Sequence, residues 1–182
     1  MNIFILNSGR CGSTTFIKAC QHITNYSSAH ESLSSKTGAQ RFNYPDRHIE
    51  ADNRLSWLLG RLDKQFPKEV FYVHLTRNKN DVATSFSKRI GFGILKAYEQ
   101  GILMHEQHLL PAQDIAEDYI ETVESNINLF LKNRINATDV SLESVKKDFT
   151  KFWGQIGAEG DLEKALQEWD VNYNATDAAH NQ

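Results

Sequence analysis

The chain opens with an apolar run that passes directly into a glycine-rich loop and then into a helical pattern. Residues 2–6 read Asn-Ile-Phe-Ile-Leu, and residues 7–15 read Asn-Ser-Gly-Arg-Cys-Gly-Ser-Thr-Thr. Apolar residues then recur at helical spacing from Phe16 to Ile23. A strand, a tight turn and a helix in immediate succession direct backbone N–H groups and the positive end of a helix at one point. This arrangement predicts an α/β unit with an anion-binding turn.

The rest of the chain alternates in the same way. Residues 70–75, Val-Phe-Tyr-Val-His-Leu, are an apolar run typical of a strand buried on both faces of a parallel sheet. Shorter extended segments are expected at 26–30 and 138–142. Helical spacing predicts helices over roughly 49–66, after Asn80, after Pro111, over 145–153 and over 162–169. We therefore expect a three-layer α/β fold, a central parallel sheet flanked by helices, similar to that of P-loop NTPases.

Length and composition favour one domain. The 182 residues suffice for a single core, which we expect to span residues 1–171, followed by a polar tail at 172–182. Residues 31–47 are polar and mixed, and are expected to form a loop or lid outside the core.

The charge balance, the length of the apolar runs and the cysteine content give no reason to expect several classes of partner. Twenty basic residues against 23 acidic ones give a net charge of -3, without the basic excess typical of nucleic-acid binding. No run is long enough to span a bilayer, so we expect neither a nucleic-acid nor a membrane partner. The two cysteines, Cys11 and Cys20, form no disulfide framework or zinc motif, and fit a reducing, cytoplasmic location without a bound metal.

Two common kinds of anion-binding loop do not fit these residues. A Walker A loop requires a lysine after its last glycine, whereas Ser13 follows Gly12 here. A cysteine-based phosphatase requires an arginine six residues after the cysteine, and that position is Ile17. A nucleotide kinase-like P-loop enzyme is therefore a disfavoured alternative. Cys11 lies beside Arg10 at a helix start, where a thiol pKa is lowered; we nevertheless expect it to serve as a small residue in a Ser-like position.

One family matches the loop better. The stretch resembles the 5′-phosphosulfate loop of sulfotransferases that use 3′-phosphoadenosine 5′-phosphosulfate (PAPS). In that family a strand leads into a basic residue, a small residue, a glycine and two hydroxyl residues. The corresponding residues are Arg10, Cys11, Gly12, Ser13 and Thr14. The resemblance implies that Gly9 to Thr15, with Thr15 as a further hydroxyl, hold the phosphosulfate, and that Arg10 lies nearest the chemistry.

A second stretch, residues 75–85, resembles the 3′-phosphate motif of the same family. There an Arg ends a central strand, an Asp opens the next helix and a Ser follows, as Arg77, Asp81 and Ser85 do here. Arg77 would lie at the carboxyl edge of the sheet, where ligands of open α/β folds bind. We expect Arg77 and Ser85 to bind phosphate, and Asp81 to pair with Arg77 on the helix.

A third, weaker similarity covers residues 140–145 and 152–154, which resemble the turn and helix end that close many sulfotransferases. Two features depart from the family. The late basic-glycine loop that adds 3′-phosphate contacts has no counterpart, and the chain is short. A non-catalytic protein that binds PAP, the 3′,5′-bisphosphate product, therefore stays an alternative.

The catalytic base is assigned by position. In much of the family a Glu or His follows the second strand, and residues 29–32 read Ala-His-Glu-Ser. We expect Glu31 to be the general base, with His30 as second choice or helper. The resemblance implies PAPS as co-substrate, no metal, and a small-molecule or glycan acceptor that presents a hydroxyl or amine. Residues 31–48 and 91–112 are expected to shape the acceptor pocket.

Overall fold

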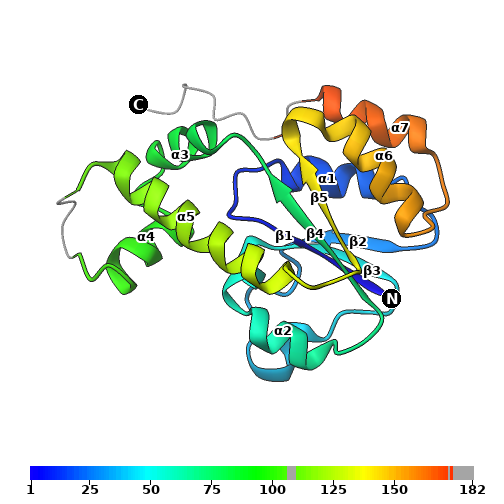
Figure 1. The fold of residues 1–182 in the computed structure, drawn as a ribbon, viewed down its shortest axis with the longest axis horizontal. Coiled ribbons are helices and arrows are strands. Elements are labelled where there is room, and N and C mark those ends of the chain that lie inside the picture. The colour runs from blue at the N-terminus through cyan, green and yellow to red at the C-terminus, as the bar shows by residue number, and fades with distance from the viewer. Residues whose placement is uncertain (106–109, 172, 174–182) are drawn as a thin grey trace.

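The computed structural model describes residues 1–105, 110–171 and 173 of the chain (Figure 1). Its sheet has the order β2-β3-β1-β4-β5, and every neighbouring pair is parallel. The strands are β1 (Asn2–Leu6), β2 (Ser27–His30), β3 (His48–Ala51), β4 (Val70–Thr76) and β5 (Ala137–Ser141). The predicted α/β class with a central parallel sheet is confirmed.

Helices cover both faces of this sheet. Figure 1 shows α1 (Ser13–Cys20), α6 (Val145–Gln155) and α7 (Leu162–Gln167) on one side, and α2 (Leu59–Gln65) and α5 (Ala112–Leu131) on the other. Two further helices, α3 (Lys79–Ser87) and α4 (Gly93–Gly101), pack against α5 and extend beyond the edge where the strands end. The three predicted layers are present.

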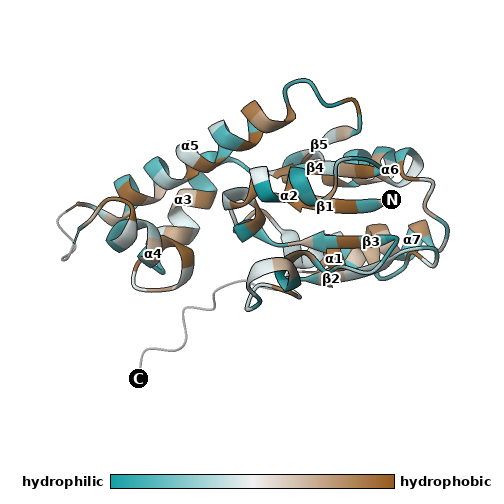
Figure 2. Ribbon diagram, turned by 90° about the horizontal axis from the view of Figure 1, so that it is seen from below, coloured by the Kyte–Doolittle hydropathy of each residue, from teal (hydrophilic) through white to brown (hydrophobic). Residues whose placement is uncertain are grey.

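The core fixes the strand ends that carry the loops. All five residues of β1 are buried, because this strand lies in the middle of the sheet. Phe16 of α1 is fully buried, with its ring 5.2 Å from those of Phe149 and Phe152. Figure 2 shows hydrophobic and hydrophilic residues interleaved along the long helix α5, and its apolar stripe from Ile115 to Ile127 is buried. The loops after β1 and β4 therefore extend from a rigid frame.

The prediction of one continuous helix over 49–66 is wrong. That segment contains β3, then a 3₁₀ helix at Asn53–Trp57, then α2. The sequence pattern did not indicate the strand β3, because its buried positions include His48 and Glu50, whose side chains are satisfied by hydrogen bonds and not by apolar contacts. The helical spacing of the leucines spans two short helices that follow it.

The expectation that the whole segment 31–47 lies outside the core is wrong. The segment holds a 3₁₀ helix at Gly38–Phe42, and Arg41, Phe42 and Tyr44 are buried. The Arg41 guanidinium is accommodated because it donates to the Asp52 carboxylate at 2.5 Å and to the Tyr44 hydroxyl at 2.9 Å. This segment therefore packs against the end of β3.

Two remaining expectations concern the surface and the tail. In the ranges 1–105 and 110–171, the structure contains no helix with the length and apolar character needed to cross a membrane. The polar tail expected at 172–182 lies outside the described residues, except for Tyr173.

Candidate functional site

The loop after β1 has a backbone that two glycines make possible. Gly9, Arg10 and Gly12 have φ angles of 99°, 60° and 89°, a region that favours glycine. A Cβ atom on Gly9 would lie 2.9 Å from Asn53 Nδ2 and 3.0 Å from Phe86 Cζ, so this position also lacks space for a side chain. The loop is therefore closely packed against its surroundings.

The carbonyl oxygens of this loop are engaged by donors from the protein. Four residues in succession accept such contacts: Asn7 O from Ser56 Oγ at 3.1 Å, Ser8 O from Tyr119 Oη at 2.7 Å, Gly9 O from Cys11 Sγ at 3.2 Å, and Arg10 O from Arg77 Nη1 at 3.5 Å. Carbonyl oxygens repel an anion, so holding them in these contacts favours an anion in front of the loop.

Helix α1 begins directly after the loop. Its N-cap is Gly12, which has no side chain to cap the helix, and its first turn is Ser13-Thr14-Thr15, without an acidic residue. The N–H groups of a first helical turn lack partners within the helix, and the helix dipole is positive there. Hydroxyl donors and main-chain amides therefore converge at one end of α1.

The second motif follows β4, the strand paired with β1. Arg77 comes directly after the strand, and Asn78 caps α3 by accepting from the Asn80 and Asp81 amides at 3.0 and 3.3 Å. The Arg77 guanidinium lies 3.6 Å from the Asp81 carboxylate, which confirms the expected ion pair. Ser85 lies one turn further along α3.

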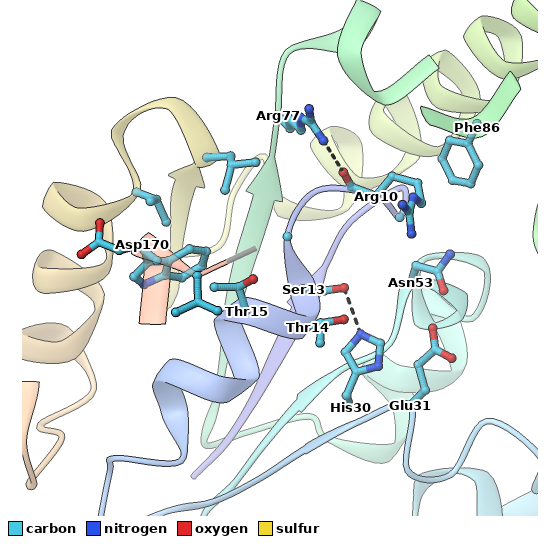
Figure 3. A pocket seen from close by; sticks show the side chains of 16 residues that line it. Arg10, Ser13, Thr14, Thr15, His30, Glu31, Asn53, Arg77, Phe86 and Asp170 are labelled. Atoms are coloured by element: carbon cyan, nitrogen blue, oxygen red, sulfur yellow. Dashed lines mark hydrogen bonds between the residues drawn. The ribbon is translucent and has the colours of Figure 1, made fainter. Parts of the chain in front are cut away.

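The two motifs meet. Arg10 Nε donates a hydrogen bond of 2.9 Å to Ser85 Oγ, and Arg77 reaches the Arg10 carbonyl, as Figure 3 shows. Burial and then the charges of Arg89 and Arg77 lower the pKa of Arg10. These positively charged groups repel one another. An anion placed among them would be attracted by each guanidinium and would offset that repulsion.

A cavity of about 550 Å³ lies between the two motifs. Nine of the predicted site residues line it: Gly9, Arg10, Gly12, Ser13, Thr14, Thr15, His30, Glu31 and Arg77. Two predicted residues do not line it. Ser85 is joined to it through Arg10, and Cys11 is buried beneath the loop with 1% of its surface exposed.

The expectation that Cys11 has a lowered thiol pKa is wrong. Burial raises the pKa of this thiol to about 12, and the effect of burial outweighs its contact with Ser8 and the charge of Arg77. The side chain instead supports the loop by donating to the Gly9 carbonyl. Cys11 therefore occupies a small, Ser-like position, which was the preferred interpretation.

This difference predicts slow alkylation. At pH 8, iodoacetamide should modify neither Cys11 nor Cys20 in the folded protein, since both thiols are buried and have raised pKa values. Peptide mass spectrometry of the native protein and of the protein unfolded in guanidinium chloride measures this directly. Modification of Cys11 well before Cys20 in the native protein would contradict it.

Glu31 and His30 approach the cavity from the end of β2. The Glu31 carboxylate accepts from Arg54 Nη1 at 2.9 Å, and His30 Nε2 shares a hydrogen bond of 3.0 Å with Ser13 Oγ (Figure 3). Burial lowers the pKa of Arg54, but the Glu31 and Asp52 carboxylates outweigh it and raise that pKa above its ordinary value. Glu31 therefore faces the cavity beside a fully charged guanidinium.

Some lining residues carried no signal in the sequence. Asn53 begins the 3₁₀ helix after β3, and lies on the same side of the cavity as Glu31 and Arg10 in Figure 3. Trp169, Asp170 and Val171 reach it from the end of the C-terminal 3₁₀ helix Glu168–Asp170. Asn53 could have been found only by recognising β3.

The third sequence similarity contributes structural support. Glu143 Oε1 accepts from the Asn78 amide at 2.7 Å, which ties the turn after β5 to the turn that carries Arg77. Leu142 Cδ1 would be 3.1 Å from a Cβ on Gly12, so this leucine packs against the first loop. The turn after β5 therefore supports both motifs. Among the residues that the structure describes, no group of three or more His, Cys, Asp or Glu side chains is arranged to hold a metal ion.

Comparisons with known proteins give the fold a name. No protein-family model and no curated protein matches the sequence. Among solved structures, the sulfotransferase domain from the curacin biosynthetic pathway superposes with a TM-score of 0.62 at 14% identity, covering 93% of this chain and 78% of that one. Mouse sulfotransferase SULT7A1 complexed with PAP gives a TM-score of 0.53 at 16% identity, covering 93% and 63%. The chain therefore has the sulfotransferase fold.

Proposed function

We propose that the protein is a PAPS-dependent sulfotransferase that transfers a sulfuryl group to a hydroxyl or amine of a small molecule or glycan. The observation that carries this proposal is the contact between the two anion-binding motifs, the hydrogen bond from Arg10 Nε to Ser85 Oγ. A ligand with anionic groups at two ends can engage the α1 loop and the Arg77 turn together. PAPS has that layout, and a cavity of about 550 Å³ lies in the range of small-molecule sites.

The proposed contacts divide into two groups. Residues Gly9 to Thr15 bind the 5′-phosphosulfate through main-chain amides, hydroxyls and the Arg10 guanidinium. Arg77 and Ser85 bind the 3′-phosphate. Arg–phosphate pairs are charge-assisted and often bidentate, and are among the stronger hydrogen bonds. The mouse sulfotransferase with the same fold was solved with PAP, which supports this choice of ligand.

The proposed reaction is an in-line displacement at sulfur. Glu31 accepts the proton of the acceptor O–H or N–H while that oxygen or nitrogen forms a bond to sulfur. The bond between sulfur and the bridging phosphate oxygen breaks, and its electron pair stays on the phosphate, which leaves as PAP. Arg10 and the first turn of α1 stabilise the charge that develops there. Glu31 then releases its proton to water.

Ligand-dependent thermal unfolding tests the donor assignment. PAP at 100 times its dissociation constant stabilises by about 2.7 kcal/mol, which for a chain of this size raises the unfolding midpoint by about 5–10 °C. Adenosine 5′-phosphosulfate, which lacks the 3′-phosphate, should give a smaller shift, and ATP and GTP little. A larger shift with ATP than with PAP, or none with PAP, contradicts the proposal.

A further inference from the structure

One face of β3 carries a row of buried polar groups. His48 and Glu50 lie two positions apart on the strand, and Asp52 follows the strand end with the same spacing; they are exposed to 5%, 0% and 0%. Strands in a parallel sheet are usually apolar on both faces, and a buried carboxylate is unfavourable without hydrogen-bonding partners. The partners of these groups therefore indicate what the row holds in place.

Glu50 binds the chain directly after Glu31. Its Oε1 accepts from the Ser32 amide at 2.7 Å, and its Oε2 accepts from the Ser32 hydroxyl at 2.7 Å. His48 Nε2 lies 3.0 Å from Glu50 Oε2, while His48 Nδ1 shares a hydrogen bond of 2.8 Å with Ser27 Oγ on β2. The Glu50 carboxylate is therefore held by His48 on one side and accepts hydrogen bonds from Ser32 with both oxygens.

Glu31 itself has a left-handed backbone, with φ at 52°. Only a few per cent of non-glycine residues adopt this region, so the surroundings must impose it. The Glu31 amide donates to the Ala51 carbonyl at 3.0 Å, and the Glu31 carbonyl accepts from the Ser34 amide at 3.2 Å. The contacts of Ser32 with Glu50 hold the other side of the same turn.

We propose that Glu50 is a positioning residue: its carboxylate clamps Ser32 and so holds Glu31 in the left-handed turn that presents the Glu31 carboxylate to the cavity. This inference rests on the proposed function, in which Glu31 is the base, and adds the buried group that positions it. Asp52, which directly follows β3, completes the arrangement, because its Oδ1 accepts from the Arg54 amide at 2.9 Å and Arg54 binds the Glu31 side chain.

Variants of Ser32 give the sharper test, because this residue is exposed whereas Glu50 is fully buried. Ser32→Ala removes the hydroxyl contact and is expected to lower kcat about tenfold through misplacement of the base, with PAP affinity unchanged. Ser32→Thr keeps the hydroxyl and should restore most of kcat. Ser35, an exposed serine of the same loop, is not among the described residues that line the cavity, so Ser35→Ala is the matched control and should behave as wild type.

A double-mutant cycle separates positioning from general destabilisation. In the Glu31→Gln background, Ser32→Ala should lower kcat no further, because the group that it positions is already gone. An equal loss in both backgrounds, or a parallel loss of PAP affinity, would overturn the proposal.

Amide hydrogen exchange tests the clamp without any activity. Glu50→Gln and Ser32→Ala should both increase exchange in residues 30–34, while Ser35→Ala should not. Unchanged exchange in both variants overturns the clamp. If the wild-type protein shows no PAP-dependent stabilisation, the proposed function fails, and the exchange result still decides whether Glu50 holds this turn.

Discussion

Glu31→Gln is expected to lower sulfuryl transfer by about 10²–10⁴-fold, the usual contribution of a positioned general base. The substitution keeps the size and one carbonyl acceptor of the side chain, so the contact with Arg54 can persist. PAP affinity should be unchanged, because the proposed donor contacts lie on the α1 loop and on the Arg77 turn. Initial rates of labelled sulfate transfer from PAPS, measured together with PAP binding by calorimetry, give both quantities.

His30→Gln is the matched comparison. His30 hydrogen bonds to Ser13 at the cavity wall, so its loss should reduce turnover less than that of Glu31 if it serves as a helper. Near-normal turnover in Glu31→Gln, with a large loss in His30→Gln, would transfer the role of base to His30. A wild-type protein that binds PAP and transfers sulfate to none of a broad panel of acceptors would instead be a non-catalytic PAP-binding protein.

Arg77→Ala is expected to raise the dissociation constant of PAP by about 30- to 150-fold. A hydrogen bond to a charged group contributes about 1.5–3 kcal/mol, and an arginine forms two with a phosphate. Because the side chain is partly exposed, we expect a loss of binding free energy of about 2–3 kcal/mol. Each 1.4 kcal/mol is a factor of ten in the dissociation constant. Calorimetric titration with PAP measures the effect.

Two controls make this result specific to the 3′-phosphate. Adenosine 5′-phosphosulfate lacks that group, so its affinity should change far less than that of PAP. Asp81→Asn removes the carboxylate that pairs with Arg77, and should leave PAP binding the same or stronger. An equal loss of affinity for both ligands in Arg77→Ala would place Arg77 elsewhere in the site.

The anion-binding elements could be predicted because they depend on local geometry. A strand followed at once by glycines, hydroxyl residues and a helix allows few other structures. Arg77 and Asp81 are four residues apart at a helix start, and they pair as that spacing predicts. Parallel neighbouring strands then bring both loops to one edge of the sheet.

Other features could not be predicted because they depend on packing between distant segments. The sequence did not indicate the strand β3, because the buried Glu50 carboxylate is compensated by hydrogen bonds from Ser32 in another loop. The thiol of Cys11 appeared activated by its neighbour in sequence, but burial raises its pKa instead. Asn53 and Trp169 meet at one cavity from segments that share no motif.

The order of the strands also bears on the synthesis of this chain. β1 is made before the other four strands of the sheet, yet it lies between β3 and β4. One edge of this apolar strand thus stays unpaired until residues 48–51 have left the ribosome and the other until residues 70–76 have, and open edges favour misassembly. The wall that includes Trp169 comes from a still later segment. The loop that begins the site is therefore made before the other segments of the site, and is among the last to gain its full surroundings.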